Sequence, residues 1–290
     1  MNYRIVHRTT YDYSEPVTVS HHAARVKPRM LDNQQRLDFA LRITPEPPVR
    51  KVRTDYFGNN VCFFSIQELH QRLDITAESL VSVTETTPPA AALSPPWEQV
   101  VTLFSDPVSP TVAEPYQFCF DSPGAQAMRE LADYAQTSFS PGTPLLQAVA
   151  DLNRRIHADF TYDPVATTVA TPLEEVIAQR RGVCQDFAHL AIASLRSMGL
   201  PARYVSGYLR TRPPEGQPRL VGADASHAWF SAFCPDLGWV DFDPTNNLKT
   251  ASEHITVAYG RDYGDVSPIS GILTGGGEHV VKVSVDVAPV

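Results

Sequence analysis

Hydrophobic residues occupy every second position through much of the chain from Tyr3 to about Val83. The clearest of these alternating positions are Leu37, Phe39, Leu41 and Ile43. Because successive side chains of a strand point to opposite faces, the pattern predicts strands with one buried face. Turn signals interrupt it at YSEP, TPEPP and DYFGNN. We therefore expect two packed antiparallel sheets, which form a β-sandwich-like N-terminal domain.

The pattern changes after TTPPAAALSPP, residues 86–96, whose proline and small residues predict an extended linker. Beyond it, hydrophobic residues recur every three or four positions, as on one face of a helix. In one such helix this face consists of Leu146, Val149, Leu152 and Ile156. A later helix should begin near Cys184 and end at Met198, because Gly199 and Pro201 stop it.

Strand-like segments follow this helix, namely ARYVSGYLR, SHAWFSAF and GWVDFD. Helices followed by an antiparallel sheet indicate an α+β fold. We expect a β-rich domain at residues 1–90, a connecting segment at 91–120, and a core with C-terminal strands at 121–290. In SHAWFSAF, alternation places Phe230 and its small neighbours towards the core and His227 on the opposite face.

The composition says more about which partners the protein can bind than about its fold. The 290 residues suffice for two domains, and the net charge is −8 with a pI near 5.6. Such an acidic chain is poorly suited to nucleic acid or an anionic membrane surface. No stretch approaches the roughly 18 apolar residues of a membrane span, and the first residues contain no apolar leader. We expect a cytoplasmic protein that contacts neither nucleic acid nor membrane.

The four cysteines are scattered without CxxC spacing, which argues against a zinc knuckle or a disulfide framework. Cys62, Cys119 and Cys234 lie in or beside apolar runs, where a small buried side chain is expected. Cys184 differs because it lies in the polar stretch RRGVCQD. Its predicted place in the first turn of a helix favours a thiolate, because unpaired backbone N–H groups and the helix dipole stabilise negative charge there.

A nucleophilic thiolate needs an imidazole that shares its proton and a further group that orients the imidazole. His227 supplies the first from a predicted strand. Asp243 supplies the second at the end of the next strand, where Pro244 ends the ladder. Asp241, one alternation earlier, is the rival orienting carboxylate.

Three motifs, GVCQDFAHL, SHAWFSAF and GWVDFDPTNN, together resemble the Cys, His and Asp motifs of the transglutaminase-like superfamily. The core of that superfamily is similar to papain-like cysteine peptidases. The stretch YRIVHRTTYDYSEPVTVSHHAARVKPR also resembles the N-terminal domain of its bacterial members, and HITVAYGRDYGDVSPISG resembles their C-terminal segment. The resemblance implies that Cys184 is the nucleophile, His227 the general base and acid, and Asp243 the orienting carboxylate.

This sequence departs from the family's pattern in the group that would donate a hydrogen bond to the oxyanion of the reaction. Eukaryotic transglutaminases use a tryptophan upstream of the cysteine, whereas residues 100–183 contain none. Tyr162, in ADFTYDP, is the nearest aromatic donor and a candidate substitute through its hydroxyl. The acidic calcium-binding loops of some animal enzymes are not evident, so we expect neither a cofactor nor metal dependence.

Several functions are compatible with these motifs. The first is a thiol-dependent enzyme that acts on a peptide or protein amide through a thioester on Cys184, and water as the acceptor would make it a cysteine peptidase or amidase. An amine acceptor would make it a protein-glutamine transglutaminase. A non-catalytic protein-binding module is a further alternative, as is a metal site. That site would consist of Cys184, Asp186, His189 and His227.

Overall fold

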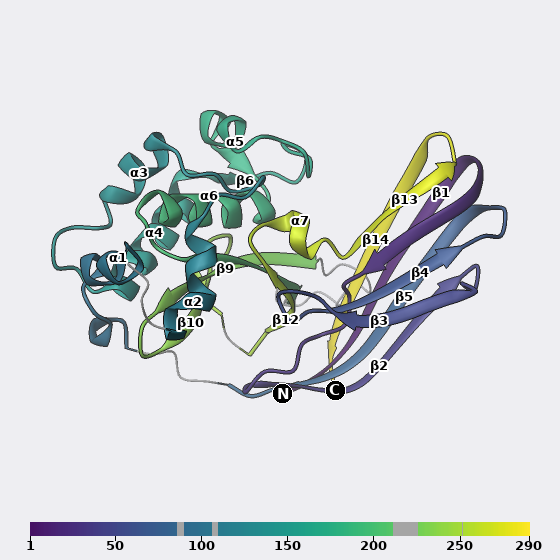
Figure 1. The fold of residues 1–290 in the computed structure, drawn as a ribbon, viewed down its shortest axis with the longest axis horizontal. Helices are drawn as coiled ribbons and strands as arrows, with labels where there is room; N and C mark the ends of the chain where they lie inside the picture. Colours follow the sequence, from purple (N-terminus) through teal and green to yellow (C-terminus); the bar gives the residue numbers. More distant parts are fainter. Residues whose placement is uncertain (86–89, 106–109, 211–225, 251) are drawn as a thin grey trace, which may run out of the picture.

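The protein has two lobes, which are a long curved sheet and a helical lobe around a smaller sheet (Figure 1). The computed structural model describes residues 1–85, 90–105, 110–210, 226–250 and 252–290. Residues 86–89 of the predicted linker lie outside this range. The predicted α+β class, with a β-rich N-terminal part and helices packed on an antiparallel sheet, is confirmed.

The N-terminal lobe is a seven-stranded sheet built around one very long strand. Its strands are β1 (Asn2–Ala24), β2 (Gln34–Thr44), β3 (Val49–Thr54), β4 (Asn60–Ile66), β5 (His70–Val83), β13 (Ile269–Gly275) and β14 (His279–Pro289). The first half of β1 lies between β5 and β14, and its second half lies between β4 and β13. The shift of partners falls between Asp12 and Val17, so β1 joins the two parts of the sheet.

The core of this lobe follows the predicted alternation. Leu41 and Ile43 are buried, whereas Leu37 is exposed at the far end of β2. The main buried positions of the lobe are Tyr13, Val17, Leu41, Ile43, Phe64, Ile66, Leu73 and Ile75. Burial of these apolar side chains between the two parts of the sheet is the main stabilising contribution here.

The C-terminal strands β13 and β14 belong to the N-terminal sheet, although the sequence grouped residues 121–290 together. Tyr3 pairs with Pro289, so the two chain ends lie side by side (Figure 1). A period-two pattern identifies a strand but does not say which sheet it joins. The two strands are joined through Gly275, Gly276 and Gly277, all with positive φ.

The helical lobe contains seven helices in the described ranges: α1 (Trp97–Ser105), α2 (Pro110–Tyr116), α3 (Arg129–Gln136), α4 (Leu145–Asp159), α5 (Leu173–Gln179), α6 (Cys184–Ser197) and α7 (Tyr263–Val266). Its strands are β6 (Thr161–Tyr162), β7 (Arg181–Gly182), β8 (Ala202–Leu209), β9 (Ser226–Cys234), β10 (Gly238–Asp243), β11 (Leu248–Lys249) and β12 (His254–Gly260). The larger sheet has the order β11-β10-β9-β8-β12, and β6 pairs with β7 separately.

The segment 91–120 carries more structure than a connecting segment. It contains α1 and α2, and it buries Val100, Phe104 and Phe118 in the core of the helical lobe. Val100 and Phe104 are four residues apart, which is the helical spacing for one face.

Helix α6 is the centre of the helical lobe. It begins at Cys184, as expected, and every residue from Asp186 to Arg196 is buried. It packs mainly on β9 and α3. Gly199 has φ 74 and follows the last turn, which explains why the helix ends there.

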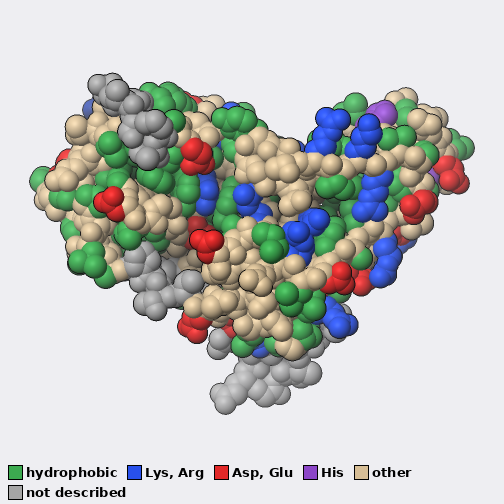
Figure 2. Space-filling view, turned by 60° about the horizontal axis from the view of Figure 1, so that its bottom comes forward, with side chains coloured by type: hydrophobic (Ala, Val, Ile, Leu, Met, Phe, Trp, Pro, Cys, Tyr) green, Lys and Arg blue, Asp and Glu red, His purple; other side chains and the backbone are tan. Residues whose placement is uncertain are grey.

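Charge is unevenly distributed over the two lobes. Figure 2 shows Lys and Arg side chains in a row over the sheet lobe. Residues 25–53 contain eight Lys or Arg and three Asp or Glu, despite the net charge of −8 for the whole chain. Among the described residues, none of the helices has the length and apolar character needed to cross a membrane.

Candidate active site

Cys184 is the first residue of α6, and it is partly buried. The carboxylate of Asp186 accepts hydrogen bonds from the backbone N–H of Val183 (2.8 Å) and from the hydroxyl of Thr167 (2.6 Å). Burial raises the pKa of this carboxyl. Asp186 therefore fixes the start of the helix that presents the thiol.

The strand before Cys184 brings Tyr162 near the thiol. Tyr162 in β6 pairs with Gly182 in β7. A Cβ at Gly182 would lie 2.6 Å from Oδ2 of Asp186, so only glycine fits beside the helix start. Burial and then the charge of Cys184 raise the pKa of Tyr162. Tyr162 is 52% exposed.

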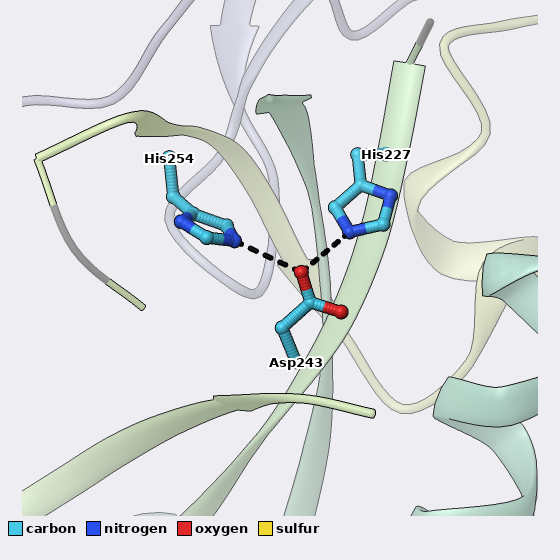
Figure 3. A group of neighbouring side chains, drawn as sticks. All are labelled: His227, Asp243 and His254. Atoms are coloured by element: carbon cyan, nitrogen blue, oxygen red, sulfur yellow. Dashed lines mark hydrogen bonds and ion pairs between the residues drawn. The ribbon is translucent and has the colours of Figure 1, made fainter. Parts of the chain in front are cut away.

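His227 in β9 and Asp243 at the end of β10 meet across the sheet (Figure 3). Nε2 of His227 donates to Oδ2 of Asp243 over 2.8 Å. The other ring nitrogen, Nδ1, points away from the carboxylate (Figure 3). The thiol of Cys184 is close enough to the ring to contribute to its raised pKa. The structure thus brings His227 and Asp243 into direct contact and places Cys184 close to the imidazole.

The pKa of His227 reflects both partners. Burial opposes the charged imidazole, but hydrogen bonds with Asp243 and Cys184 outweigh it and raise the pKa to about 10. The side chain of His227 is only 9% exposed, so these hydrogen bonds lie largely out of water. Cysteine acyl transfer requires an imidazole that is held by a carboxylate and lies near the thiol.

Asp243 is fully buried and surrounded by donors. Its Oδ1 accepts the backbone N–H groups of Thr245 (3.0 Å) and Asn246 (3.1 Å), and its Oδ2 accepts the side-chain amide of Asn246 (2.8 Å). Although burial acts in the opposite direction, these bonds and those from the imidazoles hold its pKa well below the usual range. The carboxylate therefore stays charged at neutral pH.

Asp241, the rival carboxylate, has other partners. It accepts hydrogen bonds from Nε1 of Trp229 (3.0 Å) and from the hydroxyl of Ser231. Both partners are fully buried, because the sheet is covered on both faces. The alternation of SHAWFSAF predicted burial of one face only.

Matches to known families cover both lobes. Residues 3–82 match the bacterial transglutaminase-like N-terminal region, and residues 132–244 match the transglutaminase-like superfamily. The chain is 40% identical to an uncharacterized protein of Mycobacterium tuberculosis (strain ATCC 25618 / H37Rv), over 99% of this chain and 92% of that one. An uncharacterized protein of Mycobacterium leprae is 33% identical over 98% and 97% of the two chains.

The chain belongs to the transglutaminase-like superfamily. This transglutaminase-like protein also shares its fold with a solved structure from Cytophaga hutchinsonii, described as a candidate cysteine protease. That likeness has a TM-score of 0.76 at 22% identity, over 100% of this chain and 91% of that one. A protein-glutamine gamma-glutamyltransferase of Pseudomonas aeruginosa is 32% identical over 133 residues, which are 39% of this chain and 20% of that protein.

The transglutaminase-like site contains a second histidine that the sequence did not single out. Nε2 of His254, at the start of β12, donates to Oδ2 of Asp243 over 3.0 Å (Figure 3). The ligand atoms of His227, Asp243 and His254 lie within 4.8 Å of one another, a grouping that is able to hold a metal ion. Their separations of 2.8 and 3.0 Å are those of N–H···O hydrogen bonds.

Two of the four residues that the sequence suggested as a metal site, Asp186 and His189, bind other groups in the structure. Asp186 binds Val183 and Thr167, and Nε2 of His189 accepts the backbone N–H of Tyr263 over 3.1 Å. Burial lowers the pKa of His189 to about 4, so this histidine is neutral at neutral pH. The two side chains therefore have structural partners away from His227.

A cavity of about 600 Å³ lies next to the start of α6. Gln185 and Asp186, the two residues after Cys184, line it, and so does His189 one turn further along the helix. Residues 169–173 and 261–265 also line it. This volume is typical of pockets that hold small-molecule or peptide groups.

The charged form of His227 is expected to stabilise the fold over a defined pH interval. Because its pKa rises from 6.5 to about 10 on folding, the folded chain binds the proton more tightly than the unfolded chain. This stabilisation is fully present below pH 6.5 and is lost as the pH rises to about 10. In urea titrations, the free energy of unfolding should fall more over this interval for the wild-type chain than for His227→Gln. Equal falls in the two proteins would contradict the raised pKa.

Proposed function

We propose that the protein is a thiol-dependent acyl-transfer enzyme that opens peptide or side-chain amides through a thioester on Cys184. With water as acceptor it is a cysteine peptidase or amidase. The observation that carries the proposal is the hydrogen bond between His227 and the fully buried carboxylate of Asp243, with the thiol of Cys184 at a helix N-terminus near the imidazole.

The chemistry uses each of these groups in turn. The thiolate of Cys184 attacks the carbonyl carbon of the amide and forms a C–S bond, while the negative charge moves to the carbonyl oxygen. Backbone N–H groups at the start of α6, with the hydroxyl of Tyr162, are the proposed donors to that oxygen. The C–N bond then breaks, and His227 gives its proton to the departing amine.

The second half of the reaction restores the enzyme. Water loses a proton to His227 and attacks the thioester carbon, the C–S bond breaks, and a carboxylic acid leaves. Asp243 keeps the imidazole in one orientation throughout and stabilises its charge. If an amine replaces water, the same steps give a new amide and the enzyme is a transglutaminase.

One comparison bears on the amine acceptor. The relative from Pseudomonas aeruginosa is described as a protein-glutamine gamma-glutamyltransferase, and its similarity spans 39% of this chain. The likeness covers 20% of that protein. Hydrolysis therefore remains the main proposal, and added amine decides between the two outcomes.

The proposal is tested by mass spectrometry of intact protein after incubation with a peptide library. An acyl adduct is expected on the wild-type chain and is expected to be lost in Cys184→Ala. Addition of a primary amine in a second sample distinguishes the acceptors, since only a transglutaminase yields an amide product. Identical spectra for the wild-type chain and Cys184→Ala would overturn the proposal.

The cavity beside Cys184 is the proposed place for the substrate segment next to the reacting amide. Ala170 lines this cavity and is exposed, so Ala170→Trp should narrow it without disturbing the core. We expect the rate of Cys184 modification by a peptidyl acyloxymethyl ketone to fall about ten-fold. The rate with the much smaller iodoacetamide should stay within a factor of about two, because a small reagent does not need the cavity.

A matched variant controls this measurement. Val165→Trp places the same side chain on the same loop, at a residue that is 88% exposed and does not line the cavity. It should leave both rates unchanged. Equal effects of Ala170→Trp on the two reagents would show that the cavity has no role in binding.

A peptide or protein substrate and a cytoplasmic location complete the proposal. The location comes from the sequence, and fractionation of cells that express the tagged chain measures it directly. Recovery of the protein with the membrane or periplasmic fraction would contradict it.

A further inference from the structure

Gln34 of the N-terminal lobe binds the backbone of β12 at two points. Its amide Nε2 donates to the carbonyl oxygen of Thr256 over 2.8 Å, and its Oε1 accepts the N–H of the same residue over 2.8 Å. Gln34 is only 2% exposed. A single side chain thus supplies both the donor and the acceptor that a neighbouring strand would offer.

Asn59 repeats this arrangement three residues further along β12. Its Nδ2 donates to the carbonyl oxygen of Tyr259 over 2.7 Å, and its Oδ1 accepts the N–H of Tyr259 over 2.8 Å. Asn59 is fully buried. Strand β12 is at the end of the sheet order, next to β8 alone, so these two amides occupy its outer edge. We call Gln34 and Asn59 the amide clamp.

The strand held by the amide clamp begins with His254. Nε2 of His254 donates to Oδ2 of Asp243, although β8 and β9 separate β12 from β10 in the sheet. The ring packs edge-on against Trp229, with the centroids 5.2 Å apart, and it is 6% exposed. The position of this imidazole therefore depends on where β12 is held.

Oδ2 of Asp243 is the atom at which these contacts meet (Figure 3). It accepts from His227, from His254 and from the side chain of Asn246. Backbone N–H groups hold Oδ1 of Asp243, so Oδ2 is the oxygen that faces the imidazoles. The donor from His254 adds a further bond to Oδ2 and helps to fix its position against Nε2 of His227.

We propose that His254 is a positioning residue for the His227–Asp243 pair, and that the amide clamp of the N-terminal lobe holds it in place. The proposal rests on the proposed function, because it assigns His254 to the reaction of Cys184. It gives the N-terminal lobe a part in catalysis, since the lobe sets the position of the second imidazole without touching the substrate.

Two replacements of His254 separate positioning from packing. His254→Phe keeps a ring against Trp229 but removes the donor, whereas His254→Gln keeps an amide N–H close to the position of Nε2. The readout is the rate of Cys184 alkylation by iodoacetamide as a function of pH, followed by mass spectrometry of the modified peptide. Melting temperatures confirm that both variants are folded.

His254→Phe should lower the rate at neutral pH by about ten-fold and change the shape of the pH profile. In His254→Gln, the alkylation rate and the shape of the pH profile should both be close to those of the wild-type chain. A His254→Phe profile that coincides with the wild-type profile would overturn the proposal, and so would a loss that His254→Gln fails to rescue.

The amide clamp is tested by combining variants. Gln34→Leu should slow alkylation in the wild-type background but have little further effect in the His254→Phe background, because both changes act on the same contact. Gln35→Leu, at the exposed neighbouring residue, is the matched control and should have no effect. Independent, additive losses from Gln34→Leu and His254→Phe would contradict the amide clamp.

The ring ¹⁵N chemical shifts of His227 give a readout that does not depend on reactivity. They should report a proton on Nε2 in the wild-type chain and in His254→Gln, and a changed hydrogen bond in His254→Phe. If no peptide acylates Cys184 but these shifts change as expected, the proposed function fails and the positioning role stands. Unchanged shifts in His254→Phe would remove the positioning role.

Discussion

Replacement of His227 by glutamine should lower the rate at which iodoacetamide alkylates Cys184 at neutral pH by about 10²-fold. The physical reason is that the imidazole lies close to the thiol and carries the compensating positive charge, with a pKa raised to about 10. Without it, the remaining support for a thiolate is the N-terminus of α6. Stopped-flow mixing or timed quenching, with mass spectrometry of the modified peptide, measures the rate.

Two controls make this result specific to the site. His21→Gln changes an exposed histidine that contacts Ser65 in the N-terminal lobe, and it should leave the rate unchanged. Cys119 provides an internal comparison, because burial raises the pKa of its thiol to about 12 and slow alkylation is expected there. A His227→Gln rate within two-fold of the wild-type rate would show that Cys184 reacts as an ordinary thiol.

Replacement of Asp243 by alanine should have the largest effect on stability, with a loss of about 3–5 kcal/mol in the free energy of unfolding. The carboxylate is fully buried, and its removal leaves the N–H groups of Thr245 and Asn246 without their acceptor. It also leaves a charged His227 without its counter-ion. Because the pKa of Asp243 lies well below its usual range, the stabilisation is present in full at neutral pH and declines only in acid.

Urea unfolding at neutral pH measures this loss, and Asp241→Asn is the matched comparison. Asp241 accepts from Trp229 and Ser231, so its replacement should destabilise the sheet but keep Cys184 reactive. Asp243→Ala should lose both stability and reactivity. A reactive Asp243→Ala protein would assign the orienting role to another group.

The three candidate site residues were accessible to sequence analysis because each has a local signal. Cys184 precedes an apolar helix in a polar stretch, and Asp243 stands before Pro244 at the end of a strand. His227 lies on a strand of alternating pattern. The sequence favoured Asp243 but left Asp241 as a rival, since the distinction depends on which strand neighbours each carboxylate.

His254 and the amide clamp could not be found in this way. His254 opens a strand whose neighbour in the chain is β11, whereas its neighbour in the sheet is β8. Gln34 and Asn59 lie more than 190 residues from their partners in β12. Contacts of this kind depend on how two lobes meet, and a local pattern of polar and apolar residues contains no information about it.

Contacts between the two lobes also explain why the burial of Trp229 and the position of the C-terminal strands differ from the expectation. Trp229 faces away from α6, yet it is fully buried, since it packs with Val205 and Tyr259 under the N-terminal lobe. The strands β13 and β14 return to that lobe and pair with β1. The mycobacterial relatives match over 98–99% of the chain, so the similarity includes both lobes.

The proposed function requires that Cys184 and His227 form a thiolate–imidazolium pair. The ultraviolet difference spectrum between the wild-type chain and Cys184→Ala measures the thiolate directly at neutral pH. We expect a thiolate band in this spectrum. We also expect the band to disappear when the same comparison is made in the His227→Gln background. Absence of the band in the wild-type chain, or its persistence without His227, would contradict the account.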